Sequence, residues 1–162
     1  MVAIPRALPA LSLRSRRAIA VAVGIVLIAG ALAYLHDPPW IGDVTAGLRP
    51  WETDEHGDRY RWTSGRATFF VPSTAKSMTL PLRPLPPISD RPITVDVAVD
   101  DRWLATLELP DTREPNPNVW VLHTLPLPRQ TTSRRYRRVD LRIVRVLGLF
   151  NLGVQLGVVA AR

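Results

Sequence analysis

Residues 93–109 read ITVDVAVDDRWLATLEL, and this stretch decides the fold class. Up to Val99, large apolar residues alternate with Thr, Asp and Ala, and a second apolar run extends from Trp103 to Leu109. A period of two is that of a strand with one buried face. Because aspartate tolerates positive φ, Asp100-Asp101 between the two runs predicts a two-residue turn. The stretch therefore predicts an antiparallel β-hairpin.

Short strand-like runs recur on both sides of this hairpin, separated by turn residues. They are expected at residues 60–62, 67–71, 78–82, 93–99, 103–109, 119–125, 139–146 and 152–159. Ser64-Gly65 is expected to form the turn between the first two runs, and the prolines fall at run ends or edges, where no ladder hydrogen bond is lost. No amphipathic helix of useful length follows Leu35. This spacing predicts an all-β fold, a jelly-roll-like antiparallel β-sandwich of about eight strands.

The apolar C-terminal stretch admits two interpretations. Residues 143–161 are numerous enough for a membrane span, which would return the C-terminus to the cytoplasm. Arg145, Asn151 and Gln155 interrupt the stretch, however, and from Leu152 onward large apolar residues alternate with small or polar ones. This period of two favours a buried strand.

Residues 18–35, AIAVAVGIVLIAGALAYL, contain no charge and no amide side chain. At 1.5 Å per residue they cover about 27 Å as a helix, close to the hydrocarbon core of about 30 Å. Arg14, Arg16 and Arg17 precede the run and Asp37 follows it, so the positive-inside rule keeps the N-terminus in the cytoplasm. We therefore expect a cytoplasmic basic tail at residues 1–17 and a transmembrane signal anchor at residues 18–35. A linker at residues 36–47 is then expected to lead into an extracytoplasmic domain at residues 48–162.

A cleaved signal peptide is the alternative to this anchor. Ala31-Leu32-Ala33 is a small-x-small site of the kind that signal peptidase cuts, and cleavage would release a domain beginning at Tyr34. We favour the uncleaved anchor because the apolar run continues through the candidate site. The bilayer is then the first expected partner, and the domain is exported on either interpretation.

Composition excludes some classes of site. The chain has 162 residues, a net charge of +7 and no cysteine, so disulfides and thiolate-bound zinc play no part. The length allows one domain and an appendage. The positive charge is uneven, because eight basic residues and one acidic residue lie between Arg129 and the C-terminus.

Three motifs carry a resemblance to a known family. Residues 61–67 (RWTSGRA), residues 97–102 (VAVDDR) and residues 152–157 (LGVQLG) resemble an extracytoplasmic β-sandwich module of bacterial membrane proteins, often found with polytopic glycosyltransferase-like proteins. This sequence departs from the usual pattern at Ser64, at Asp101 and at Phe150-Asn151. The resemblance covers about residues 48–160. It implies a sandwich held at a bacterial inner membrane in a polysaccharide-related setting, and it assigns no catalytic residue.

The five tryptophans are candidates for stacking on sugar rings. Trp51 and Trp103 are expected to be exposed and are the candidate binding residues. Trp62 and Trp120 lie within expected strands and are expected in the core, and Trp40 is expected at the membrane interface. A core or interface role is the alternative for all five.

The densest basic stretch lies between Arg129 and Arg145, and within it Arg134, Arg138 and Arg142 are candidate binding residues. Nucleic acid conflicts with an exported location, so no nucleic-acid partner is expected. Acidic polysaccharide or anionic headgroups fit the compartment better. A solvated strand face is the alternative.

No catalytic or metal constellation is evident. The carboxylates and His56 between Asp54 and Asp58 could hold a cation, but their spacing fits no known metal motif, and a polar loop explains them equally well. The three histidines are far apart, and no G-x-S-x-G is present. We therefore expect no cofactor and a non-catalytic binding module that contacts a membrane protein or an envelope glycan. The alternative is a hydrolase or transferase acting on envelope polysaccharide.

Overall fold

The computed structural model describes residues 13–84, 92–110, 119–130, 133–144 and 152–162. The chain divides into two compact units, Met1–Pro38 and Pro39–Arg162. In the first unit, helix α1 (Leu13–His36) begins ahead of the predicted span, and none of its residues is buried. Among the described residues, α1 is the one helix long and apolar enough to cross a bilayer, which also fits a signal sequence. The predicted apolar helix is thus present, as either an anchor or a signal.

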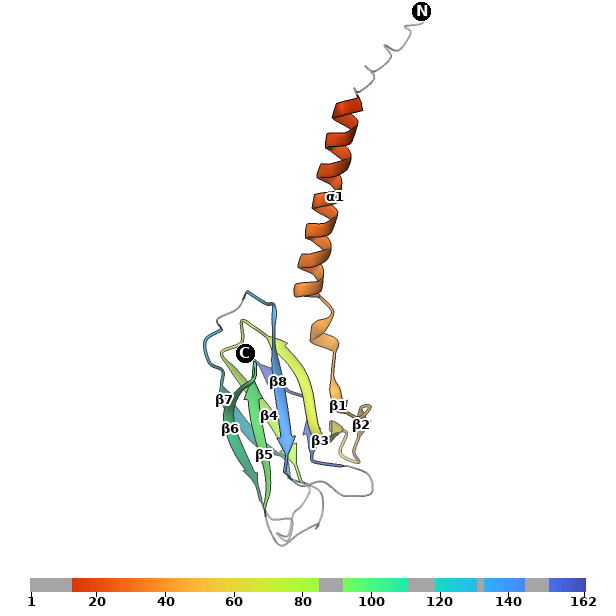
Figure 1. Cartoon of the computed structure of the whole chain (residues 1–162). Coiled ribbons are helices and arrows are strands. Elements are labelled where there is room, and N and C mark those ends of the chain that lie inside the picture. The colour runs from red at the N-terminus through yellow and green to blue at the C-terminus, as the bar shows by residue number, and fades with distance from the viewer. Residues whose placement is uncertain (1–12, 85–91, 111–118, 131–132, 145–151) are drawn as a thin grey trace, which may run out of the picture. The chain divides into compact units, whose positions relative to one another are not determined.

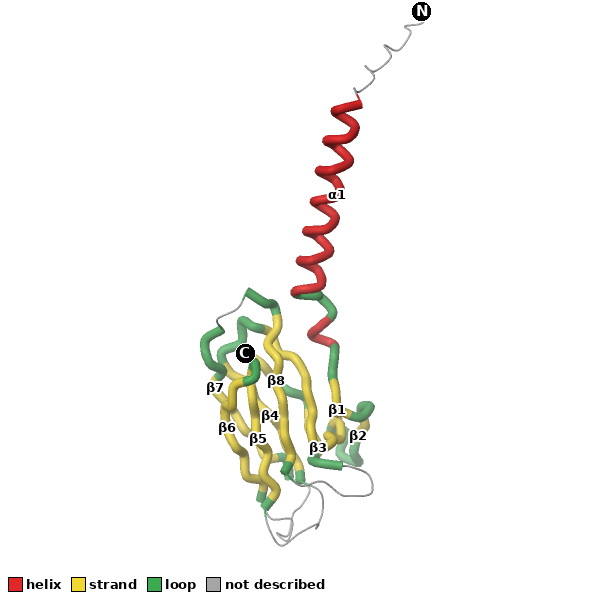
Figure 2. Tube along the Cα trace, in the orientation of Figure 1, coloured by secondary structure: helices red, strands yellow, loops and turns green. Residues whose placement is uncertain are grey.

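The second unit is built from ten strands within the described residues. They are β1 (Ala46–Leu48), β2 (Glu52–Thr53), β3 (Arg59–Pro72), β4 (Ser77–Arg83), β5 (Ile93–Val99), β6 (Arg102–Leu109), β7 (Val121–Pro126), β8 (Tyr136–Ile143), β9 (Gln155–Gly157) and β10 (Ala160–Ala161). Helix is confined to α1 and a short 3₁₀ turn, η1 (Ile41–Asp43), in the part of the chain that the structure describes (Figure 2).

These strands form two antiparallel sheets (Figure 1). Sheet A has the order β1-β3-β8-β5-β6, and sheet B has the order β2-β3-β9-β4-β7, with β10 following β9 along β4. The chain changes sheets between β1 and β2, within β3, and then between β3 and β4, β4 and β5, β6 and β7, β7 and β8, and β8 and β9, which is the winding of a jelly roll. The predicted all-β sandwich is confirmed.

The β5–β6 hairpin has the predicted geometry. Asp100 and Asp101 adopt φ of 51° and 66°, the left-handed values that a two-residue turn of this type requires. Before the turn, Val95, Val97 and Val99 are fully buried and the intervening side chains face outward. Local alternation and a local turn therefore fix this part of the fold.

The core lies between the two sheets and receives alternate side chains from each. Its fully buried members are Met78, Leu80 and Leu82 from β4, Val95, Val97 and Val99 from β5, Leu109 from β6, Val139 and Leu141 from β8, and Val154. Full burial of one such aliphatic side chain stabilises the fold by about 1.5–3 kcal/mol. Ala67, Phe69 and Val71 of β3 join this core and Thr63 is also buried, so the even-numbered residues between Trp62 and Phe70 face outward.

Strand β3 corrects one sequence prediction. The separate runs 60–62 and 67–71 are a single strand, and Ser64-Gly65 is extended backbone inside it rather than a turn. The first part of β3 pairs with β2 and β9 in sheet B, whereas Arg66–Pro72 pairs with β8 in sheet A. The strand therefore passes from one sheet to the other at residues 63–65.

Hydrogen bonds between Thr63 and Val154 fix this crossing. The Thr63 hydroxyl is fully buried, donates to the carbonyl of Val154 at 2.9 Å and accepts from the Val154 N–H at 2.8 Å. The Thr63 N–H donates to the same carbonyl, and the Gly153 N–H donates to the carbonyl of Thr63 at 2.7 Å. A Cβ on Gly153 would lie 2.5 Å from the Thr63 hydroxyl oxygen, so this approach requires glycine. We call this set of bonds the Thr63–Val154 bridge.

The described part of the C-terminal stretch contains two short strands, β9 and β10, and no helix. β9 lies between β3 and β4, and β10 continues along β4, so a second membrane span is wrong for residues 152–162. Residues 145–151 of the predicted span lie outside the described residues. The alternation shifts after Gly157, because Val158 is 60% exposed whereas the neighbouring Val159 packs against the core.

The substitution Thr63→Val is expected to lower the free energy of unfolding by about 1–3 kcal/mol, because it leaves the buried Val154 N–H without its acceptor. Chemical denaturation measures the loss, and hydrogen exchange at the Val154 amide should become faster. Thr63→Ser keeps the hydroxyl and serves as the control. Equal exchange rates at Val154 in the two variants would contradict the role of the bridge.

His123, on β7, predicts a pH dependence of stability. Burial lowers the pKa of its imidazole below the ordinary value of 6.5, and its buried Nε2 has no hydrogen-bond partner among the described residues. Since the unfolded chain protonates more readily, the contribution of His123 is fully present above about pH 6.5 and is lost as the pH falls below it. The free energy of unfolding should fall between pH 7.5 and 5.5. His123→Leu should flatten this dependence, whereas the control His56→Gln, at an exposed histidine, should leave it unchanged.

Candidate functional site

The outer face of sheet B gathers aromatic and charged side chains. Backbone pairing places Trp62 opposite Gln155 and Gln155 opposite Arg83, so these three side chains form a row across β3, β9 and β4. The guanidinium of Arg83 extends the row to Trp120, immediately before β7, and lies 4.5 Å from the centre of that ring. The row depends on register between segments that are distant in sequence.

Arg83 is the charged centre of this face. Its side chain is only 9% exposed, and it forms an ion pair with Asp54 at 3.0 Å and donates to the amide oxygen of Gln155. A buried guanidinium must be paired in this way, because an uncompensated charge in the interior is costly. Partial burial alone would raise the pKa of Asp54, but hydrogen bonds from the Asp58 backbone N–H and from Arg83 lower it below its ordinary value. The carboxylate of Asp54 therefore stays ionised at neutral pH.

The rings of Tyr60 and Trp120 pack beside this ion pair, with the Arg83 guanidinium 5.4 and 4.5 Å from their centres. The ring of Tyr60 meets Trp62 edge-on at 5.9 Å and lies 6.5 Å from Trp120. The indole N–H of Trp120 donates to Asp58 at 3.1 Å, and the hydroxyl of Tyr60 donates to Glu52 at 3.0 Å. Burial, together with this bond to Glu52, raises the pKa of Tyr60. Each ring is thus fixed on two sides.

The acidic loop between β2 and β3 supplies these partners. One oxygen of Asp54 accepts hydrogen bonds from the backbone N–H groups of His56 and Asp58, at 3.0 and 2.9 Å. Its other oxygen binds Arg83, and Asp58 binds Trp120. The carboxylates are therefore used within the domain, and the described residues contain no group of three or more that could hold a metal ion.

A groove of 390 Å³ opens next to Trp120, and we call it the sheet B groove. Its lining residues are Asp58, Arg59, Pro81, Trp120, Leu122, Gly157 and Val158. Gly157 forms part of the floor, since a Cβ there would lie 3.0 Å from Pro81 and 3.5 Å from the Trp120 ring. Leu122 and Val158 are 65% and 60% exposed. The groove is thus apolar, with one carboxylate and one guanidinium.

The structure places the two predicted binding tryptophans apart from each other. Trp103 is 69% exposed on β6, at the edge of sheet A. Trp51 is 44% exposed near β2, and the guanidiniums of Arg59 and Arg61 lie 5.0 and 5.4 Å from its ring centre. Trp51 does not line the sheet B groove but contacts Arg59, which does. Trp103 lies on the other sheet.

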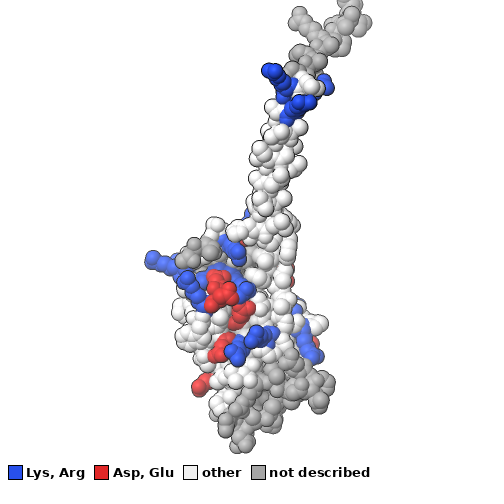
Figure 3. Space-filling view, viewed as in Figure 1, with Lys and Arg blue, Asp and Glu red and all other residues white. Residues whose placement is uncertain are grey.

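The predicted binding arginines also differ from one another. Arg138 lies between Asp101 and Asp140, and its hydrogen bond to Asp140 contributes most to a raised pKa. Arg142 is exposed near the end of β8, and Arg134 is exposed ahead of that strand. Figure 3 shows basic and acidic side chains interspersed on the face that β8 and β5 present, rather than one basic patch.

Sequence reasoning missed the side chains that gather on the outer face of sheet B, at and beside the groove. Trp62 and Trp120, expected in the core, are half-buried on the outer face of sheet B. The signal was present in the phase of β3, because burial of Ala67, Phe69 and Val71 turns the even-numbered Trp62 outward. No local pattern indicated that Arg83, Gln155 and Trp120 would meet.

Comparison with known proteins gives matches among solved structures. No family model matches the chain, and no curated protein matches it. Among solved structures, a family 35 carbohydrate-binding module from an environmental isolate is 12% identical over 72% of this chain and 86% of that chain, with a TM-score of 0.47. A family 6 carbohydrate-binding module is 10% identical over 73% and 85% of the two chains, with a TM-score of 0.45.

A glucuronidase of family 115, described as specific for decorated arabinogalactans, is 12% identical with a TM-score of 0.45. The match covers 72% of this chain but only 17% of the enzyme. At TM-scores below 0.5, these similarities support no inference about ligand or activity.

Proposed function

We propose that the β domain is a non-catalytic module that binds a glycan in the sheet B groove. The observation that carries this proposal is the Trp120 indole, fixed by Asp58 and Arg83 at the side of a groove whose floor includes Gly157. Ligand sites of this kind combine apolar and aromatic surface with a few placed polar groups.

The chemistry of a sugar ring suits this groove. The C–H face of a pyranose is apolar and packs on an aromatic ring, while its hydroxyls need hydrogen-bond partners at the edge. Trp120, Pro81 and Leu122 offer the apolar surface, and Asp58 and Arg59 offer an acceptor and a donor. The indole N–H of Trp120 already donates to the carboxylate of Asp58 at 3.1 Å, so the ring loses little conformational entropy when a ligand binds.

The same geometry argues against turnover. Glycoside hydrolysis usually needs two carboxyl groups on either side of the scissile bond. Among the described lining residues, Asp58 is the one carboxylate, and the nearby Asp54 is bound by Arg83 and two backbone N–H groups. This supports binding without chemistry.

A protein partner is the second candidate, and a specific observation favours it. Leu122 and Val158, which line the groove, leave most of their surface exposed to solvent, and Val119 close by is 53% exposed. Exposed apolar surface of this kind also marks docking sites for proteins. The glycan proposal rests on the fixed indole and polar edge, which a flat docking surface does not need.

We further propose that α1 anchors this module in a bacterial inner membrane with its N-terminus in the cytoplasm. Three arginines lie in the first turns of the helix, and the apolar residues follow without interruption. Confinement at the membrane surface would raise the effective concentration of the module near a membrane-bound glycan or partner.

The glycan proposal predicts the effect of Trp120→Ala. A glycan array identifies a bound oligosaccharide, and titration calorimetry on the full-length protein in an uncharged detergent measures its Kd. The Kd should rise about tenfold, since loss of a stacking surface worth about 1.4 kcal/mol corresponds to that factor. Trp103→Ala, on sheet A, is the matched control and should leave the Kd unchanged.

Two results would contradict this prediction. One is an equal loss of affinity in both tryptophan variants. The other is the absence of any bound glycan, together with a co-purifying protein that Leu122→Asp releases, which would favour the docking alternative.

The anchor predicts how the full-length protein behaves in cells. It should remain with the membrane fraction after a carbonate wash, and protease added to spheroplasts should digest the β domain. Intact mass spectrometry should show residues 1–33 still attached. A mature N-terminus at Tyr34 would instead identify a cleaved signal and contradict the anchor.

A further inference from the structure

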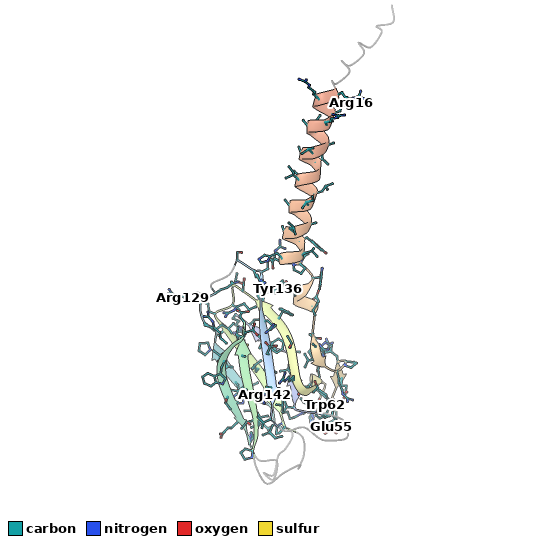
Figure 4. The ribbon with its side chains drawn as sticks, in the orientation of Figure 1. Arg16, Glu55, Trp62, Arg129, Tyr136 and Arg142 are labelled. Atoms are coloured by element: carbon teal, nitrogen blue, oxygen red, sulfur yellow. The ribbon has the colours of Figure 1, made fainter. Side chains whose placement is uncertain are left out.

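A second concave region lies on the outer face of sheet A, where two arginines face each other. Backbone pairing places Arg66 on β3 directly opposite Arg142 on β8. Both side chains are exposed, and Figure 4 labels Arg142 near the end of β8. Like charges directly opposite each other in an antiparallel pair are unfavourable. The arrangement therefore needs an explanation.

Three other arginines of the two sheets are paired with acids, whereas Arg59, Arg61 and Arg102 form no ion pair within the described residues and have no second arginine opposite them in the register. Arg83, Arg137 and Arg138 each form ion pairs with aspartates, at 3.0, 2.9 and 2.8 Å. Arg66 and Arg142 form no such pair with any acid in the described ranges. Two uncompensated guanidiniums thus point out from neighbouring strands.

The aspartate closest in register does not neutralise them. Asp96 on β5 lies opposite Arg142, on the side away from Arg66. Its carboxylate accepts a hydrogen bond from the hydroxyl of Thr106 at 2.6 Å and forms no ion pair with Arg142 within 4.0 Å. The aspartate opposite Arg142 therefore does not neutralise its guanidinium.

A concavity of 480 Å³ surrounds the pair. The described residues that line it are Ser64, Gly65, Arg66, Arg142, Ile143 and Val144, with no acidic side chain among them. The one hydroxyl hydrogen of Ser64 is shared between two backbone carbonyls, of Arg66 at 2.7 Å and of Gly47 at 3.1 Å. Among the described lining side chains, the two guanidiniums are therefore the donors that a ligand could use.

We propose that this concavity binds an oxyanion carried by a glycan, a carboxylate or a sulfate. A guanidinium presents two parallel N–H donors that match the two oxygens of such a group. An anion between Arg66 and Arg142 would bond to both and remove their repulsion. This proposal rests on the proposed function only where it names a glycan as the carrier of the oxyanion. The binding of the oxyanion itself is argued from the arginine pair alone.

The test uses the full-length protein in an uncharged detergent at low ionic strength, with sodium sulfate and an oligogalacturonate as probes. Both probes should bind and should raise the temperature of unfolding. Arg66→Gln and Arg142→Gln should each weaken both probes at least fivefold. Arg102→Gln removes one exposed charge elsewhere on the domain and should stay within twofold of the parent protein. Equal weakening in all three variants, or none in the first two, would overturn the site.

Further experiments test whether the oxyanion is carried by a glycan, separately from whether the arginine pair binds an oxyanion at all. Sulfate binding without oligogalacturonate binding would overturn the choice of a glycan. In phosphatidylcholine nanodiscs the weakening of sulfate binding by Arg66→Gln and Arg142→Gln should be the same with and without added phosphatidylglycerol. If that weakening disappears when phosphatidylglycerol is added, lipid headgroups occupy the pair instead. Trp120→Ala should leave sulfate binding intact, so a failure of the sheet B groove and a failure of this site are distinguishable.

Discussion

The Thr63–Val154 bridge is the interaction on which the rest of the domain depends. At residues 63–65 the strand β3 leaves sheet B and enters sheet A, and it has to exchange one set of pairing partners for another. The buried hydroxyl of Thr63 supplies both a donor and an acceptor to Val154 at this place. Backbone groups that would otherwise be left unpaired in the core are satisfied, so one strand can join both sheets.

The crossing also explains how residues close in sequence serve different faces. Asp58, Arg59 and Tyr60 precede the crossing and lie at the outer face of sheet B, by the groove. Arg66 follows it and lies on the outer face of sheet A, opposite Arg142. A continuous strand in one sheet would have placed all of these side chains in a single sheet. The bridge therefore separates an apolar, aromatic groove from a basic concavity.

Local signals in the sequence predicted those parts of the fold that local interactions decide. Alternation and Asp100-Asp101 were sufficient for the β5–β6 hairpin, whose pairing is between neighbours. Ser64-Gly65 has the composition of a turn, but the adjacent Thr63 pairs with Val154, which is distant in sequence, and Ser64-Gly65 stays extended within the strand. The groove was missed for the same reason, because Trp120, Arg83 and Gln155 meet only through the register of β4, β7 and β9. Which face each tryptophan occupies follows from that register.

The buried Arg83–Asp54 pair has a cost that its position beside Trp120 explains. Removing two charges from water is expensive, and an apolar pair of similar volume would often give an equally stable domain. An apolar replacement would remove the Arg83 guanidinium that contacts the Trp120 ring. It would also remove the Asp54 carboxylate that fixes the acidic loop, whose Asp58 accepts the hydrogen bond from the indole N–H. The pair thus contributes orientation more than stability. A groove arranged before its ligand arrives is what a binding module requires, because rigid side chains lose little entropy when the ligand binds.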